Sequence, residues 1–213
     1  MKNFSLLFVL VLLASCSSYN SEDYVDLFNG KDLSGWKGTA GMDSYKITDG
    51  ILRVNSTEKG QHLLFVGDGD EKFKDFELIV VSKADPLSNS GIYFHTDGTS
   101  RHKAGWLHYG YEVQLNCTEK EKRKTASLYG VQDLAESPVD EMDWFELKIR
   151  VKGQRIQVWA DGKQVVDYTE PKNIERPKNR AGRFLNPEGG YIAIQAHDTK
   201  SVWYFKTIKI RVL

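Results

Sequence analysis

The feature that most constrains this chain is a series of short segments in which apolar and polar residues alternate, with many β-branched and aromatic side chains. A period of two residues is that of a strand with one buried face. The longer segments cover residues 76–81, 91–95, 111–115, 145–151, 155–159, 191–196 and 205–212, and shorter ones cover 45–47, 51–54 and 63–65. We find no amphipathic helical pattern longer than two turns. The sequence therefore predicts an all-β fold.

Tight-turn signals separate several of these strands. Gly50 and Gly162 each follow an aspartate and Gly153 follows a lysine, which is typical of hairpin turns. Many short strands joined by such turns indicate an antiparallel β-sandwich or jelly roll. Three longer irregular stretches cover residues 96–110, 116–143 and 170–188. Loops of that length in a compact β domain are usually functional or mobile, and we expect these three to rim one face.

The N-terminus has the pattern of a bacterial lipoprotein signal. Lys2 precedes an apolar run over residues 4–13, which is shorter than the roughly 20 residues that span a bilayer. Leu13-Ala14-Ser15-Cys16 then resembles a lipobox, which predicts cleavage before Cys16 and acylation of that cysteine. We therefore predict a signal peptide over 1–15, a lipidated N-terminus and tether over 16–25, and one β-sandwich domain over 26–213. The expected location is the bacterial cell envelope, periplasmic or surface-exposed.

Charge and cysteine content narrow the classes of partner. The chain has 29 basic and 29 acidic residues, and no basic stripe that would favour nucleic acid. The short basic cluster at 120–124 is flanked by acids and reads as a solvated loop. Cys117 is the one cysteine besides Cys16, so the domain must rely on its core rather than on an internal disulfide. We assign no nucleophilic role to Cys117.

Three of the predicted strands share an unusual polar face. Side chains alternate across a strand, so each strand can be sorted into an apolar set and a second set. The second sets contain Tyr93 and His95, Glu112 and Gln114, and Gln195 and His197. A solvated face more often carries lysine, glutamate and arginine, as residues 146–150 do here. Planar hydrogen-bonding groups beside titratable groups suit sugar hydroxyls and proton transfer, so we interpret this face as a carbohydrate site.

Several segments then resemble a known family. Residues 28–36, Phe-Asn-Gly-Lys-Asp-Leu-Ser-Gly-Trp, are similar to the opening of the bacterial 3-keto-disaccharide hydrolase family. Further matching segments follow in the family's order, at residues 89–93, 110–114, 127–130, 158–167 and 205–212. The resemblance spans about 26–213. It implies a concanavalin A-like sandwich whose sugar-facing sheet acts on glycosides oxidised to a ketone at carbon 3.

That implied chemistry is elimination followed by hydration. A ketone at carbon 3 acidifies the proton on carbon 2, and the aglycone oxygen on carbon 1 lies β to the enolate. Loss of the aglycone and addition of water then give net hydrolysis without the paired carboxylates of ordinary glycosidases. The activity could be that of a hydrolase or of a lyase.

The resemblance also suggests roles for individual residues. The base is His95 or His197, with Glu112 as an alternative base or as a ligand. Gln114 and Gln195 would hold hydroxyls or the enolate oxygen, and Tyr93 would stack or donate a proton. We also assign substrate contacts to Asn89 and Tyr129, which lie in two of the matching segments. Members of the family often have glycine after a Gln-x-His motif, whereas here Asp198 follows His197.

Alternatives and partners complete the prediction. A divalent metal held by His and Glu could polarise the ketone, although no ligand spacing requires one. A separate oxidoreductase would make the keto-sugar. Glu141 and Asp143 mimic the acid spacing of laminarinase-type glycosidases, but the odd positions of the strand that follows form the core, so these acids would be out of phase or still in the loop. The rival functions are a non-catalytic carbohydrate-binding lipoprotein of the envelope and a structural or adhesion module.

Overall fold

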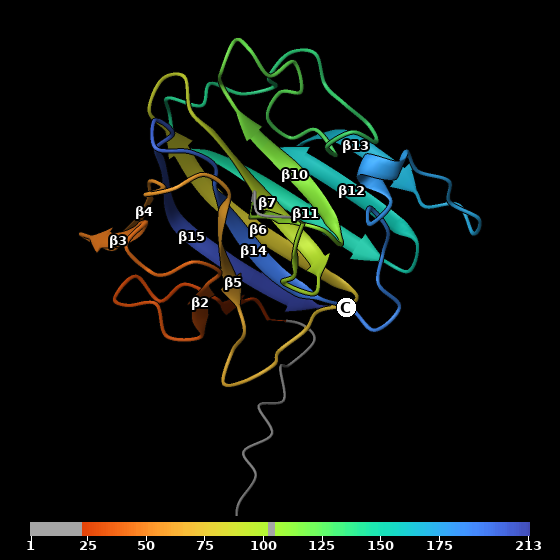
Figure 1. Cartoon of the computed structure of the whole chain (residues 1–213), viewed down its shortest axis with the longest axis horizontal. Helices are drawn as coiled ribbons and strands as arrows, with labels where there is room; N and C mark the ends of the chain where they lie inside the picture. The colour runs from red at the N-terminus through yellow and green to blue at the C-terminus, as the bar shows by residue number, and fades with distance from the viewer. Residues whose placement is uncertain (1–22, 102–104) are drawn as a thin grey trace, which may run out of the picture.

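Two antiparallel sheets packed face to face form the domain (Figure 1). The structure is a computed structural model that describes residues 23–101 and 105–213. The predicted signal peptide and Cys16 lie outside the described residues. Within them, no helix has the length and hydropathy needed to cross a membrane. The predicted all-β antiparallel sandwich is confirmed.

The larger sheet has eight strands, and β6 and β15 lie at its centre. In spatial order its strands are β13 (Lys163–Thr169), β12 (Arg155–Ala160), β11 (Phe145–Lys152), β6 (Phe76–Ala84), β15 (Trp203–Val212), β4 (Ile51–Val54) and β3 (Tyr45–Thr48), with β1 (Val25–Asp26) also paired to β15. Cross-strand pairs explain its stability. Leu78 of β6 lies opposite Ile149 on one side and Ile210 on the other, and all three are fully buried.

The smaller sheet has five strands. In spatial order they are β10 (Tyr111–Asn116), β7 (Asn89–Thr96), β14 (Tyr191–Ala196), β5 (Gln61–Phe65) and β2 (Trp36–Gly38). A separate hairpin, β8 (Ser100–Arg101) with β9 (Trp106–Leu107), and the 3-10 turn η2 (Lys178–Arg180) lie in loops. The predicted hairpin turns are present. Asp49, Gly50, Asp161 and Gly162 all have positive φ, as two-residue hairpin turns of this kind require.

The main hydrophobic core fills the space between the sheets. The apolar sets of the smaller sheet point into it, for example Ile92, Val113 and Ile194, which are each at most 1% exposed. A second, small cluster lies on the opposite face of the same sheet, where Leu107 of β9 packs with Leu64, Tyr93 and Ala193. The hairpin and neighbouring loops therefore cover the outward face of the five-stranded sheet, and strands β5, β7 and β10 are buried throughout.

Candidate active site on the five-stranded sheet

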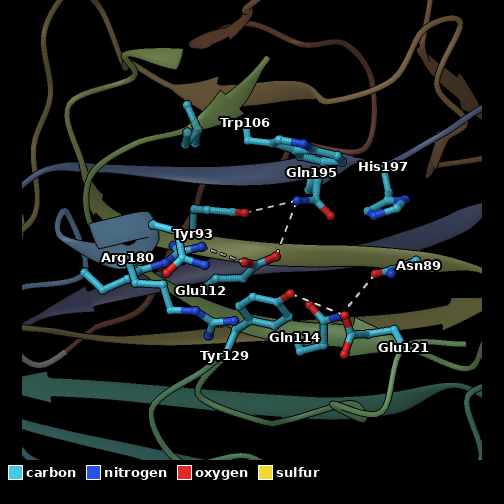
Figure 2. Close-up of a pocket in the computed structure, with 13 residues that line it drawn as sticks. Asn89, Tyr93, Trp106, Glu112, Gln114, Glu121, Tyr129, Arg180, Gln195 and His197 are labelled. Atoms are coloured by element: carbon cyan, nitrogen blue, oxygen red, sulfur yellow. Dashed lines mark hydrogen bonds and ion pairs between the residues drawn. The ribbon is translucent and has the colours of Figure 1, made fainter. Parts of the chain in front are cut away.

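A cavity of about 300 Å³ opens on the outward face of the five-stranded sheet (Figure 2). It is lined by Asn89, Tyr93, Trp106, Leu107, Glu112, Gln114, Glu121, Tyr129, Asn179, Arg180, Arg183, Gln195 and His197. Every site residue predicted from the sequence lines this cavity except His95. The phase of three strands thus assembles the polar floor, because register places Glu112 opposite Tyr93 and Gln114 opposite Gly91.

Glu112 lies at the centre of the floor and is 4% exposed. Arg183 Nη2 donates to its Oε2 at 3.0 Å, and Gln195 Nε2 donates to its Oε1 at 3.3 Å and to the Tyr93 hydroxyl at 3.1 Å. Burial raises the pKa of the Glu112 carboxyl, and the positive charge of Arg183 only partly offsets this effect. The buried carboxyl is therefore easier to protonate than an exposed glutamate, which suits a group that gives and takes a proton.

Gly91 makes room for this carboxyl. A Cβ at position 91 would lie 2.5 Å from Glu112 Oε1 and 3.0 Å from its Cγ. Glu112 has little freedom to move, since both of its oxygens are hydrogen-bonded. The glycine is thus required by close approach of the carboxyl across β7 and β10.

His197 follows β14 at the rim of the cavity. Its Nδ1 lies 2.7 Å from Asp198 Oδ2, and its ring packs against Trp106 with 4.9 Å between centroids. Burial acts to raise the pKa of Asp198, but the hydrogen bond with His197 and backbone donors outweigh it, so the net pKa is lowered. An ionised Asp198 fixes the ring with Nδ1 as donor, and no hydrogen bond to Nε2 occurs within the described residues. Nε2 is then the basic nitrogen of an oriented histidine.

The remaining predicted contacts form the other walls. Gln114 Nε2 donates to Asn89 Oδ1 at 3.2 Å, and the Tyr129 hydroxyl donates to Glu121 Oε2 at 3.3 Å. Backbone pairing holds Tyr129 beside the floor, because its N–H donates to the Glu112 carbonyl. These amide and phenol groups offer both donors and acceptors to sugar hydroxyls.

The expectation that His95 shares the polar face is wrong. Register shifts in the β7–β14 pairing, so that Phe94 and His95 together lie opposite Ile192 alone, and His95 has a φ of 57°. An extra residue of this kind is a β-bulge and reverses the alternation beyond it. The ring packs against Phe76, with Nδ1 3.1 Å from the Asn186 carbonyl and Nε2 2.9 Å from the Lys74 carbonyl. His95 lies outside the cavity lining, and we give it no catalytic role.

Sequence reasoning missed the residues that the long loops supply. Residues 96–110 contribute Trp106, residues 116–143 contribute Glu121, and residues 170–188 contribute Arg180 and Arg183. The loop lengths predicted that these stretches would rim one face, and they do. Loop residues do not alternate between two faces as strand residues do. The sequence therefore did not predict that the two arginines of the third loop would line the cavity. Glu141 and Asp143 lie outside the cavity lining.

His62 of β5 was also missed. It lies opposite Gln195 across the β5–β14 pair, with its ring 5.0 Å from Tyr93 and 6.4 Å from Trp106, and it is fully buried. Burial, with Arg183 and His197 nearby, lowers the pKa of His62 to about 3. It is therefore a neutral ring that packs edge-on against Tyr93 and Trp106.

The described residues do not fit a divalent metal. Residues 23–101 and 105–213 contain no group of three or more His, Cys, Asp or Glu side chains that could hold one. Glu112 is committed to Arg183, and His197 is committed to Asp198. We derive no step through a metal.

The chain is similar to a curated relative and to solved structures. The chain is 27% identical, over 91% of its own length and 80% of the relative's, to the 3-keto-disaccharide hydrolase of Bacteroides thetaiotaomicron. A solved protein of Parabacteroides distasonis, provisionally named a glycosyl hydrolase, has a TM-score of 0.73 at 19% identity, covering 90% of this chain and 94% of that one. Carbohydrate-binding module CBM66 of Bacillus subtilis has a TM-score of 0.55 at 15% identity, covering 84% and 96%. These two likenesses show the shared β-sandwich fold.

The family comparison covers almost all of the described chain. The model of the 3-keto-alpha-glucoside-1,2-lyase-like domain matches residues 23–211, which include every strand of both sheets except the last residue of β15, Val212. The chain therefore belongs to the family of 3-keto-α-glucoside-1,2-lyase-like domains.

Proposed function

We propose that this protein cleaves 3-keto-glycosides by proton abstraction at carbon 2, elimination of the aglycone and addition of water. Its family and its glycosidase-like relatives support a glycoside-acting enzyme with a sugar substrate. The elimination mechanism is supported by one observation: the cavity is lined both by His197, which Asp198 orients, and by Glu112, a buried carboxyl whose pKa is raised. Elimination from a keto-sugar needs one group to take a proton and another to give one.

His197 takes the first role. Its Nε2 removes the proton from carbon 2 of the keto-sugar, while Asp198 on Nδ1 stabilises the imidazolium that forms. The electron pair of the C–H bond becomes the enolate of the carbon 3 ketone. That enolate then expels the oxygen on carbon 1, and a double bond forms between carbons 1 and 2.

Glu112 takes the second role. In its protonated form the carboxyl gives its proton to the departing oxygen, so the aglycone leaves as a neutral alcohol. Glu112 is then ionised beside Arg183, whose guanidinium stabilises the new charge. In hydration, Glu112 accepts the proton of the water that adds to carbon 1, and His197 returns its proton to carbon 2. Both groups regain their starting states, and water is the one co-reactant consumed.

Ordinary glycosidase chemistry through Glu112 and Glu121 is the competing use of this cavity. Arg123 lies 3.1 Å from Glu121 Oε1, and Tyr129 donates to Oε2, so both oxygens have partners. Burial acts to raise the pKa of Glu121, but the Arg123 interactions outweigh it and the net pKa is lowered. Glu121 is therefore held as an ionised wall residue, and Glu112 is the carboxyl that can donate a proton.

The test is incubation of the purified protein with a 3-keto-disaccharide and with its unoxidised parent, in D₂O, with and without chelator. We expect aglycone release and exchange at carbon 2 for the keto-sugar alone. Saturable binding of both sugars without release or exchange would instead identify a carbohydrate-binding protein.

Leaving-group dependence tests the roles of the two residues separately. Glu112→Gln should slow release of a sugar aglycone by about 100-fold, within the range of general acid catalysis. It should slow release of 4-nitrophenol much less, because that aglycone leaves readily without a proton. Glu146→Gln, the same change on the exposed face of β11, is the matched control and should leave both rates unchanged. Equal losses for both aglycones would remove Glu112 from the donor role.

The predicted anchor and upstream enzyme belong to the same proposal. We propose that Cys16 is acylated and holds the domain at the bacterial envelope. A 3-keto-glycoside arises by oxidation of the carbon 3 hydroxyl, so an oxidoreductase must supply the substrate. Incorporation of labelled fatty acid that is lost in Cys16→Ala would support the anchor, whereas an unlabelled, fully soluble wild-type protein would contradict it.

A further inference from the structure

One end of the cavity carries a positive charge that the proposed chemistry does not use. Three guanidinium groups surround the Tyr129 ring, with Arg123 at 4.8 Å, Arg180 at 5.0 Å and Arg183 at 6.0 Å from its centroid. Of these three, Arg180 and Arg183 line the cavity. Three guanidinium groups around one ring repel one another, and nearby carboxylates can offset that repulsion.

Two of the three arginines have carboxyl partners. Arg183 is paired with Glu112 at 3.0 Å. Arg123 is paired with Glu121 at 3.1 Å and with Asp133 at 3.0 Å. Within residues 23–101 and 105–213, no carboxylate is paired with Arg180. Of the three arginines around Tyr129, Arg180 is therefore the one without a carboxylate partner.

Arg180 is also held in place. Gly130, with a φ of 69°, lies directly against it, and a Cβ at position 130 would fall 1.2 Å from Arg180 Nη1. The Arg180 N–H donates to the Pro177 carbonyl, and the Arg183 N–H donates to the Arg180 carbonyl, so a tight turn presents both side chains. A guanidinium fixed by a ring and a backbone loses little freedom when it binds a ligand.

The loop around Arg180 is anchored to the sandwich by the buried Glu170 and the half-buried Arg176. Glu170 Oε2 accepts a hydrogen bond from the Leu185 N–H at 2.9 Å. Arg176 donates to the hydroxyls of Tyr111, at 2.9 Å, and Tyr168, at 2.8 Å. These contacts tie both ends of the turn to the sandwich, so Arg180 is part of a built wall rather than a loose surface side chain.

We propose that the Arg180 end of the cavity is a subsite for an acidic sugar, whose carboxylate binds the guanidinium. This inference rests on the proposed function for its orientation. Figure 2 draws Arg180 on the opposite side of Glu112 from His197. Because Glu112 protonates the departing oxygen and His197 acts at carbon 2, the acidic group belongs to the departing aglycone. A planar carboxylate matches the two-pronged donor geometry of arginine.

Two substrates that differ only in the aglycone test the subsite. One 3-keto-glucoside carries glucuronic acid as its aglycone and the other carries glucose. We expect kcat/KM to favour the acidic aglycone by about tenfold at low ionic strength, which corresponds to about 1.4 kcal/mol. The preference should shrink as salt is added, because the cavity is open to solvent. A sulfated glucose aglycone shows whether any oxyanion suffices or a carboxylate is required.

Three variants locate the effect. Arg180→Gln should bring the ratio of the two kcat/KM values close to one while cleavage of the neutral substrate persists. Gly130→Ala keeps every charge but displaces the guanidinium, so it should also reduce the preference. Lys178→Gln removes one positive charge from the same turn at an exposed residue outside the cavity lining, and should leave the ratio unchanged.

Calorimetric binding of sodium glucuronate and of glucose separates this inference from the proposed function. If neutral keto-glycosides are cleaved without an acidic preference, and Arg180→Gln changes neither ratio nor binding, the subsite is refuted and the proposed function stands. If no keto-glycoside is cleaved but glucuronate binds more tightly than glucose in an Arg180-dependent way, the proposed function fails and the acidic subsite stands.

Discussion

The outward faces of the two sheets differ sharply, although both sheets are antiparallel and pack on the same core. Strand β11 of the larger sheet alternates buried and open residues, and its outward set is Glu146, Lys148 and Arg150. Strand β10 of the smaller sheet is buried at every residue, although its outward set includes Glu112 and Gln114. The first face meets water, and the second lies beneath three loops, the first of which carries the β8–β9 hairpin.

This difference in burial changes the free-energy cost of a polar side chain on each face. A charge in water needs no partner, whereas a buried polar group costs free energy unless it is hydrogen-bonded. The five-stranded sheet offsets part of that cost with a connected set, in which Arg183 and Gln195 donate to Glu112 and Gln195 also donates to Tyr93. Arg183 Nε and Gln195 Oε1 are buried without a hydrogen-bond partner among the described residues. Buried polar networks with perturbed pKa values are concentrated at functional sites, and this is why we propose the covered face as the active site.

The largest expected effect comes from the histidine at the rim of the covered face. His197→Asn removes the proposed base, so we expect cleavage of a 3-keto-glycoside to fall by 10²- to 10⁴-fold and exchange at carbon 2 to vanish. The midpoint of thermal unfolding should hardly move, since the ring is partly exposed. His108→Asn is the matched control, because His108 lies on the same loop as Trp106 but outside the cavity lining. Unchanged exchange in His197→Asn would contradict the base assignment.

A smaller effect is expected from filling the space beside Glu112. Gly91→Ala places a Cβ 2.5 Å from Glu112 Oε1, which must displace the carboxyl from Arg183 or from Gln195. We expect kcat to fall by about tenfold to 100-fold, because a misplacement near 1 Å has effects of that order. Gly69→Ala, at an exposed glycine with no atom within 4 Å of the added Cβ, should have no effect. Equal kinetics for the two variants would show that Glu112 is not held as described.

The sequence predicted the two faces well wherever strands are regular. Tyr93, Glu112, Gln114 and Gln195 lie on the covered face because a period of two fixes their direction relative to the apolar residues of the core. The prediction that His95 lies on the same face was wrong for a local reason. The bulge adds one residue to β7, and a bulge depends on how β14 and the backbone of Gly190 pack against it rather than on the composition of β7 itself.

The loops mark a second limit of sequence reasoning. Their lengths indicated that they are functional, and all three reach the cavity. The position of Arg183 depends on its ion pair with Glu112, which joins residues 71 positions apart in the chain. A contact of that range leaves no periodic trace in the sequence, so it could be found only once the fold had placed the third loop over the sheet.

The histidine that turns away from the covered face should affect stability rather than catalysis. His95→Ala removes two contacts to backbone carbonyls and a ring that packs on Phe76. We expect the free energy of unfolding to fall by about 1–3 kcal/mol. The rate per folded molecule should stay within about twofold of wild type, as measured after correction for the folded fraction. A loss of rate comparable with that of His197→Asn would return His95 to the site.

The smallest expected effect is a pH dependence of the free energy of unfolding that arises from Glu112 on the covered face. Burial raises the pKa of Glu112 against the opposing influence of Arg183. A group whose pKa is higher in the folded than in the unfolded chain holds its proton more tightly when folded. The free energy of unfolding therefore falls as pH rises from the ordinary glutamate value, about 4.3, through the folded pKa.

For a single group the slope is at most about 1.4 kcal/mol per pH unit. Glu112→Gln cannot titrate, so the stability of wild type minus that of Glu112→Gln should decrease across this window and become constant above it, as measured by urea unfolding at a series of pH values. Glu146→Gln on the water-facing sheet corrects for the general effect of losing one carboxylate. A difference that increases with pH would mean that Arg183 outweighs burial. Glu112 would then remain ionised and could not protonate a departing oxygen, and the covered face would keep its histidine base but lose its proton donor.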